Sequence, residues 1–235
     1  MKNLFLIITS ALILSSCTFN LGTKGNGNIV SQERAISESF NKISANSGID
    51  VYLTKGTDAR IIVETDENLQ QFIETEVKNG KLEITTSKKI GWSKAKKVYV
   101  TFIDLNEIQA ASGASIVSNS LIKSENLSLN SSSGGELEIE VFSKALVAQT
   151  SSGSEIKVRG KSSSFSANAS SGSEIDAKEL QTIEAKVQAS SGADIKLQVR
   201  DKLTAQASSG AEIQYYGNPL SVDANKSSSG SVNKK

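Results

Sequence analysis

One three-residue phrase recurs through the second half of this 235-residue chain and constrains its fold more than any other feature. The phrase is Ser-Ser-Gly, with Ala-Ser-Gly in the first copy, and its glycines follow one another at intervals of 21, 19, 19, 20, 18 and 20. Seven copies with a period of about 20 residues are typical of a solenoid, in which each repeat packs only on its neighbours. The glycines are Gly113, Gly134, Gly153, Gly172, Gly192, Gly210 and Gly230.

Apolar residues alternate with polar ones on both sides of each glycine. Ile or Leu stands three residues after each of the first six glycines, as at Leu137 and Ile156, and a second, mostly apolar position follows two residues later. The same alternation precedes the glycines, as at Leu203, Ala205 and Ala207. A period of two indicates two short strands per repeat, each with one face inward. Strands stacked about 4.8 Å apart form parallel sheets, so we expect an all-β parallel β-helix of about 20-residue coils.

The phrase itself predicts a structural corner. Glycine suits a backbone that turns sharply through positive φ. The two serines before it can satisfy local backbone groups and bond to their copies one coil away. Serine is abundant for this reason, with 29 of its 39 copies after position 100.

An amide side chain stands four residues before each of the first six glycines. Stacked coils would bring these amides into one column, in which each side chain bonds to its copies above and below. We favour this structural amide ladder over the alternative, a ligand-binding amide row. Its members are Gln109, Asn130, Gln149, Asn168, Gln188 and Gln206.

An acidic row also follows the corners, two residues after five of the glycines. One interpretation is a cation-binding row, since Ca²⁺ takes several oxygen ligands. We favour a solvated outer corner, because the residues two positions further on alternate in sign or are neutral, and surface charges interact weakly in water. The acidic residues are Glu136, Glu155, Glu174, Asp194 and Glu212.

The first residues of the chain predict export. A basic start is followed by an apolar run from Leu4 to Leu14, which is too short to span a bilayer but suits a signal peptide. The run ends at Leu14-Ser15-Ser16-Cys17, which resembles the bacterial lipobox. We expect a lipoprotein signal peptide at residues 1–16 and lipid attachment at Cys17. An ordinary secretory signal is the alternative, but the only Cys stands where the lipobox requires it.

Composition excludes several classes of function. The chain has no His, so a Ser-His-Asp triad, a His general base and a His-ligated metal are impossible. A single Cys allows no intramolecular disulfide. Lys and Arg number 26 against 25 Asp and Glu, which argues against nucleic acid as a partner. We expect no catalytic residue, no metal and no cofactor.

The order of motifs predicts one domain with distinct flanks. Gly and Asn after Cys17 indicate a flexible tether at 17–36, and the domain is expected at 37–230. Within it, 37–104 is an irregular β-rich part, 105–230 holds the coils, and 231–235 is a tail. Asp223 and Asn225 are expected at inward positions, as a polar capping coil requires.

The first half carries a family resemblance. Its motifs are the strand-Ser-Gly-strand phrase from Phe40 to Leu53, the Asp66-Glu67-Asn68-Leu69 turn and the Asn79-Gly80-Lys81-Leu82 hairpin, followed by the Ser-Ser-Gly coils. Together they resemble the head GIN domain family of auto-transporter adhesin-like proteins in Bacteroidota, over roughly residues 38–230. The resemblance implies a right-handed β-helix in an exported protein, and it implies no activity or catalytic residues.

These observations lead to one functional hypothesis with two alternatives. We expect a non-catalytic, lipid-anchored cell-envelope protein for binding or adhesion, which meets the membrane through its lipid and an envelope glycan or protein through its β-helix surface. Surface lipoproteins of such bacteria often carry an acidic cluster after the cysteine; none follows Cys17, which favours the periplasmic face of the outer membrane over the cell surface. The alternatives are a polysaccharide-acting β-helix enzyme, which would need pocket-forming loops that the regular period leaves no room for, and a structural spacer.

Overall fold

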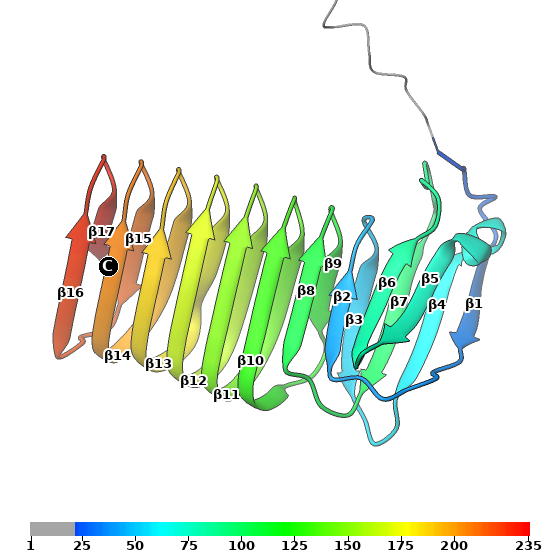
Figure 1. The fold of residues 1–235 in the computed structure, drawn as a ribbon, viewed down its shortest axis with the longest axis horizontal. Helices are drawn as coiled ribbons and strands as arrows, with labels where there is room; N and C mark the ends of the chain where they lie inside the picture. The colour runs from blue at the N-terminus through cyan, green and yellow to red at the C-terminus, as the bar shows by residue number, and fades with distance from the viewer. Residues whose placement is uncertain (1–21) are drawn as a thin grey trace, which may run out of the picture.

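The computed structural model describes residues 22–235 and shows a β-solenoid of about seven turns, each of about 19 residues (Figure 1). The predicted parallel β-helix fold is therefore confirmed. The predicted signal peptide and Cys17 lie outside the described residues. No helix within 22–235 has the length and hydropathy needed to cross a bilayer.

Each coil is a flattened loop with two sheets. The strand segments that precede the Ser-Gly corners form one sheet, here called the pre-corner sheet, and those that follow form the post-corner sheet. A long strand such as β11 bends at the edge opposite the corners, so its first half lies in the post-corner sheet and its second half in the pre-corner sheet. The long strands are β10 (Ile122–Ser132), β11 (Glu136–Ser151), β12 (Glu155–Ser170), β13 (Glu174–Ala189) and β14 (Asp194–Ala207).

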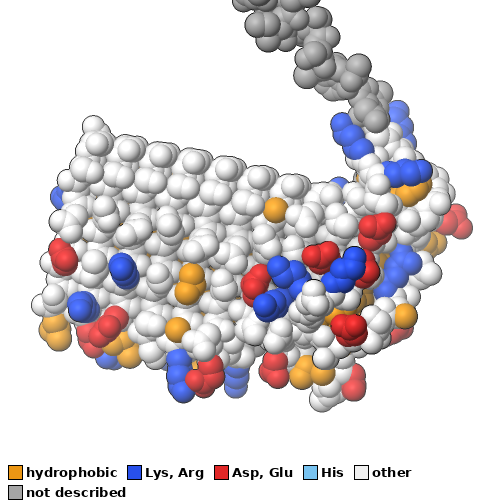
Figure 2. Space-filling model, viewed as in Figure 1, with side chains coloured by type: hydrophobic (Ala, Val, Ile, Leu, Met, Phe, Trp, Pro, Cys, Tyr) orange, Lys and Arg blue, Asp and Glu red, His pale blue; other side chains and the backbone are white. Residues whose placement is uncertain are grey.

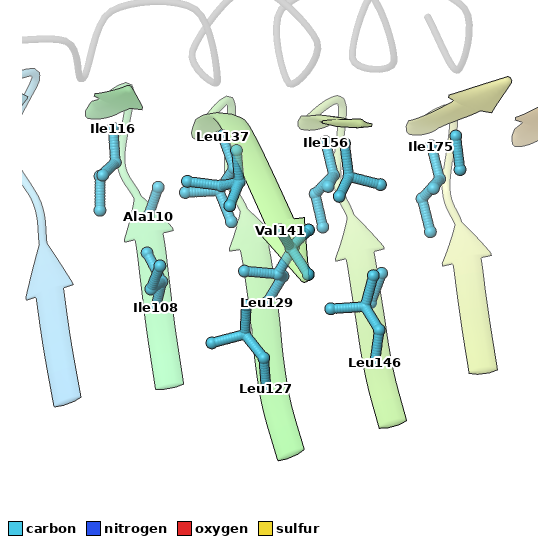
Figure 3. Packing of buried hydrophobic residues seen from close by; sticks show 14 of the residues in the cluster. Ile108, Ala110, Ile116, Leu127, Leu129, Leu137, Val141, Leu146, Ile156 and Ile175 are labelled. Carbon is cyan, nitrogen blue, oxygen red and sulfur yellow. The ribbon is translucent and has the colours of Figure 1, made fainter. Parts of the chain in front are cut away.

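The alternating sequence pattern becomes a continuous column of buried side chains. Leu137 pairs in register with Ile116 on one side and Ile156 on the other, and Ile156 pairs with Ile175. All four side chains are buried between the sheets, beside their counterparts from the pre-corner strands (Figure 3). Because identical positions stack from coil to coil, aliphatic side chains fill the core with little help from aromatic ones.

Coils begin earlier in the chain than we expected. β2 (Lys42–Ala45) and β3 (Asp50–Lys55) flank the Ser47-Gly48 corner and pair in parallel with β8 (Glu107–Ala111) and β9 (Ser115–Ser118). On their other side they pair in parallel with β6 (Lys81–Thr86) and β7 (Lys96–Phe102). The chain therefore enters at the second coil, moves outward to build the first, and then returns to begin the regular stack. The part at 37–104 that was predicted as irregular already contains two coils.

Antiparallel strands close the N-terminal end of the stack. β4 (Arg60–Asp66) pairs with β7, and β1 (Ile29–Arg34) pairs with β4. β5 (Ile73–Lys78) forms the predicted Asn-Gly hairpin with β6. Between β4 and β5, the 3₁₀ helix η2 (Glu67–Phe72) buries Leu69 completely. This cap shields the core of the first coil from water.

The boundaries predicted for the two flanks are wrong. Residues 23–34 do not behave as a tether, because Thr23 bridges Ile90 and β1 is a strand of the sheet. At the other end, β15 (Glu212–Tyr216), β16 (Ser221–Lys226) and β17 (Ser231–Lys234) continue the stack. Val232 in β17 is buried, so 231–235 is part of the last coil rather than a tail. Main-chain pairing with the neighbouring strand outweighs the polar composition of both segments.

The orientation expected for the last polar coil is also wrong. Asp223 pairs in register with Thr204 and Asn225 with Gln206, so both occupy outward positions. The inward positions of β16 belong to Val222, Ala224 and Lys226, which follow the buried positions of β14. The register of this strand is one residue away from the one that the sequence suggested, and such a shift exchanges the two faces of a strand.

Candidate binding site

The corners are stabilised through the main chain. In the regular coils both the second serine and the glycine have positive φ, as at Ser171 (56°) and Gly172 (66°). The glycine N–H then donates to the serine carbonyl of the next coil, as from Gly172 to Ser191 at 3.1 Å. Positive φ is found at Gly113, Gly134, Gly153, Gly172, Gly192 and Gly210.

Two details of the corner prediction are wrong. In the last coil the two residues with positive φ are Ser228 and Ser229, so Gly230 stands one position beyond the corner. Within residues 22–235, the hydroxyls of the paired serines form no bonds from coil to coil; the peptide groups do so instead. Sequence reasoning missed the buried residue after the glycine, such as Ser154, whose Oγ accepts from the Ser151 N–H at 3.2 Å. The signal for it was the small residue that always follows the glycine.

The six amides form a column, but few hydrogen bonds join one amide to the next. Asn130 pairs in register with Gln109 and Gln149, and the column continues in the same way to Gln206. Among the described residues one hydrogen bond joins two of these amides, from Gln188 Nε2 to Gln206 Oε1 at 3.4 Å. Most of the side chains are exposed to solvent. The amides are therefore in the predicted place, but their bonding capacity is largely free for another molecule.

The first four of these amides line a shallow groove on the outer side of the pre-corner sheet. The groove has a volume of about 350 Å³ and contains Asn130, Gln149 and Asn168 together with serines beside the corners. No charged side chain lines it. Figure 2 shows this sheet from outside, with few charged side chains over the half nearest the corners. The surface offers hydroxyl and amide groups that repeat once per coil, about 4.8 Å apart.

The outer side of the post-corner sheet has a different character. Arg159 lies 3.4 Å from Glu138 and 3.1 Å from Glu140, and Lys196 lies 2.7 Å from Glu174. Of these pairs between successive coils, the one from Lys196 to Glu174 neutralises a member of the acidic row. The post-corner face therefore carries paired charges, whereas the amide groove of the pre-corner face has no charged side chain in its lining.

The acidic row shows no metal-binding geometry. In the part of the chain that the structure describes, no three Asp, Glu or Cys side chains gather closely enough to hold an ion. Burial, together with the neighbouring carboxylates of Glu174 and Glu212, raises the pKa of Asp194. Asn233 Nδ2 donates to Glu212 Oε1 at 3.1 Å, and this bond lowers the pKa of Glu212.

A second groove, which none of the sequence motifs predicted, follows the edge opposite the corners. Its volume is about 630 Å³, and it is lined by Phe142, Ile183 and Val199 together with Lys161 and Arg200. Phe142 is 55% exposed, unusual for an aromatic side chain in such a regular structure. The available signal was an apolar residue at a position where the other coils carry Lys or Gln. Neither this groove nor the amide groove is lined by a carboxylate, so the acid pair of polysaccharide hydrolases is not found in them.

A rod of stacked coils with one flat polar face is the architecture of a β-solenoid head domain. The family described as "Putative auto-transporter adhesin, head GIN domain" matches residues 39–219. The chain belongs to this family, which confirms the resemblance drawn from its motifs.

Solved structures share the fold at low sequence identity. A "putative adhesin" from Bacteroides fragilis is 20% identical with a TM-score of 0.85, over 91% of this chain and 100% of that one. A "putative lipid binding protein" from Parabacteroides distasonis is 22% identical with a TM-score of 0.73, over 91% of this chain and 99% of that one. A "putative adhesin" from Parabacteroides merdae is 20% identical with a TM-score of 0.69, over 91% of this chain and 98% of that one. No curated protein matches the chain.

Proposed function

We propose that this protein is a non-catalytic, lipid-anchored cell-envelope protein that uses the pre-corner face of its solenoid for adhesion to an envelope glycan. The observation that carries the proposal is the uncharged groove of in-register amides and serines. Membership in an adhesin-head family supports a cell-envelope binding role. A neutral polymer with one hydroxyl-bearing unit after another matches a surface that repeats its hydrogen-bonding groups at every coil.

The amide groove can be tested with a variant that keeps the fold. Asn130→Ala, Gln149→Ala and Asn168→Ala remove three outward-facing amides without touching the core. On a glycan array we expect specific, saturable binding by the native chain. Each lost hydrogen bond should weaken binding about fivefold. The matched control is Glu138→Ala, Glu140→Ala and Lys157→Ala on the opposite face. Equal losses in both variants, or silence of the native chain on the array, would contradict glycan binding through this face.

The membrane anchor is tested separately. Cys17→Ala should move the protein from the membrane fraction to the soluble fraction, because the thioether-linked lipid would be missing. Cys17→Ser serves as a second variant that removes the thiol with little change in size. A protein that stays in the membrane fraction in both cases is not anchored through Cys17. Protease shaving of intact cells then distinguishes the periplasmic face, which we propose, from the cell surface.

The groove at the opposite edge supports a second candidate function. Its apolar side chains lie beside Lys161 and Arg200, a combination that suits an amphipathic ligand with an anionic head. A solved structure of the same fold is named a lipid-binding protein. Phe142→Ala should reduce uptake of a fluorescent fatty acid while leaving glycan binding unchanged. A fatty acid that binds neither the native chain nor the variant removes this candidate.

A further inference from the structure

One corner of the stack differs from all the others. The register of β6 with β2 and of β7 with β3 places residues 87–95 at the corner edge of the first coil. The corners in the regular coils are short and consist of Ser, Gly and Ala, whereas this one is a longer loop, here called the 87–95 loop. In Figure 1 the connection between β6 and β7 rises beside the point at which the described chain begins.

The chemistry of the loop also differs from that of the serine corners. Lys88, Lys89, Trp92 and Lys94 are all exposed, and Trp92 is 58% exposed. Lys24 is exposed on the segment that pairs with the loop. Figure 2 shows Lys and Arg side chains on both sides of the place where the described chain begins. The loop thus combines positive charge with an exposed indole.

The positive charge of this region is not neutralised by acidic neighbours. None of these four lysines has a carboxylate within ion-pair distance among residues 22–235, although many lysines elsewhere on the solenoid do. Lys88 instead lies over the Phe72 ring, with Nζ 5.0 Å from the ring centre. A contact with an aromatic face leaves the full charge of the ammonium group in place. The region therefore presents net positive charge to anything that approaches it.

The loop is held in place by the segment that precedes β1. The Thr23 N–H donates to the Lys89 carbonyl at 2.9 Å, and the Gly25 N–H donates to the Trp92 carbonyl at 2.8 Å. The buried carboxylate of Asp66 accepts from the Gly27 N–H at 2.6 Å and the Lys94 N–H at 2.8 Å. Trp92 and the lysines are therefore displayed from a fixed backbone and not from a free loop.

The position of the loop places it close to the proposed anchor. Thr23 is already paired with the loop, and only five residue steps separate Gly22 from Cys17. A chain of that length reaches about 18 Å at most. A lipid on Cys17 would therefore hold the 87–95 loop near the membrane surface, within reach of this short connection.

We propose that the 87–95 loop docks on the membrane, with Trp92 at the interface and Lys24, Lys88, Lys89 and Lys94 against anionic lipid headgroups. Tryptophan is enriched at membrane interfaces, and clustered lysines are attracted to anionic lipids. This inference rests on the proposed lipid anchor, which brings the loop to the surface. Because the 87–95 loop lies at the corner edge of the first coil, docking would turn the N-terminal part of that edge toward the bilayer (Figure 1).

The experiment uses the mature chain with Cys17→Ser, so that any binding is independent of the lipid. Vesicles contain one part phosphatidylglycerol to two parts phosphatidylcholine, with pure phosphatidylcholine as the comparison. Trp92 is the only tryptophan, so its emission reports on the loop directly. We expect a blue shift and cosedimentation with the anionic vesicles only. Each lysine changed to Gln should weaken binding about fivefold at low salt, so the triple variant Lys88→Gln, Lys89→Gln, Lys94→Gln should weaken it about 100-fold.

The control variant is Lys123→Gln, Lys186→Gln, Lys202→Gln, which removes the same charge from exposed positions on distant coils. It should bind like the parent chain. Equal losses in the two triple variants would assign binding to net charge and overturn the docking site. No Trp92 shift with either vesicle would also overturn it, even when Cys17→Ala proves the lipid anchor. A crosslinker placed at position 92 that captures a protein, with vesicles silent, would assign the loop to a protein partner instead.

Discussion

At the scale of single residues, glycine has two different roles in this solenoid. At the corners, Gly172 has a φ of 66° and nothing lies near the position of an added Cβ. At the opposite edge, Gly160 has a φ of 116°, and an added Cβ would collide with the Val141 carbonyl oxygen of the preceding coil. The corner glycines ease a turn that Ser228 and Ser229 also achieve, whereas Gly160 is required by both conformation and space.

Alanine substitutions at Gly172 and Gly160 should therefore lower the free energy of unfolding by different amounts. Gly172→Ala should lower the free energy of unfolding by about 1–2 kcal/mol, the cost of a left-handed conformation with a Cβ. Gly160→Ala should lower it by about 3 kcal/mol or more, because backbone strain and a main-chain clash add. Urea unfolding of both variants measures the difference. Equal losses at the two positions would contradict the distinction.

At the scale of elements, one buried carboxylate joins three segments at the N-terminal cap. Asp66 is the last residue of β4 and precedes η2, and its oxygens accept from Gly27 before β1 and from Lys94 and Ala95 before β7. Burial alone would raise the pKa of Asp66, but these N–H donors outweigh it and hold the pKa below its usual value. This charged side chain adds to the main-chain hydrogen bonds that keep the short, polar segment before β1 on the domain.

The pH dependence of this cap has a defined sign. Because the pKa of Asp66 is lowered in the folded state, its stabilisation is complete above the unfolded value of about 3.9 and is lost as the pH falls through the folded value. Asp66→Asn should lower stability by about 2 kcal/mol at pH 7 and speed hydrogen exchange at residues 23–34. The two proteins should converge at acidic pH.

Asp58→Asn, at an exposed position in the turn before β4, is the matched control and should change little. Unchanged exchange at residues 23–34 in Asp66→Asn would show that the segment is held by other contacts.

At the scale of the whole molecule, the two ends of the rod differ in whether further strands cover the terminal coil. The N-terminal end is closed by β4, β1, β5 and η2, whereas β16 and β17 have no strand beyond them among the described residues (Figure 1). Val222 is 42% exposed at this open end. Lys226 stands at an inward position, in register with Ala207, and Asp223 accompanies it on the same strand. Charges on an open strand edge oppose pairing with a second chain.

Removing the charges of Asp223 and Lys226 should allow the open strand edge to pair with a second copy of the chain. Asp223→Val with Lys226→Val leaves an apolar strand with free main-chain groups, so we expect dimers or larger species by light scattering at concentrations where the native chain is a single species. Lys123→Val and Lys161→Val, away from the edge, control for added surface hydrophobicity. A doubly substituted edge that behaves like the native chain would mean that strand geometry alone protects this end.

The fold was predictable from the local sequence pattern, because every repeat places apolar residues at the same inward positions relative to its Ser-Ser-Gly corner. Alternating Ile and Leu around each Ser-Ser-Gly specify which side faces inward, and the period specifies how often the chain returns, so the stack of Ile116, Leu137, Ile156 and Ile175 follows. The amide column was predictable for the same reason. The orientation of β16 was not, because its sequence lacks the alternation that sets the register of the other coils.

Other features depend on which segments meet in space. The reversal that places β2 and β3 between the first and third coils, the pairing of β1, and the 87–95 loop beside Thr23 involve partners far apart in the chain. Their sequences are polar or degenerate, and hydrogen bonds between main-chain groups carry no side-chain signature. The repeat in the sequence therefore determines the stack of coils. Long-range backbone pairing, which only the tertiary structure shows, determines which strands cap the N-terminal end of the stack and which loop lies near the proposed anchor.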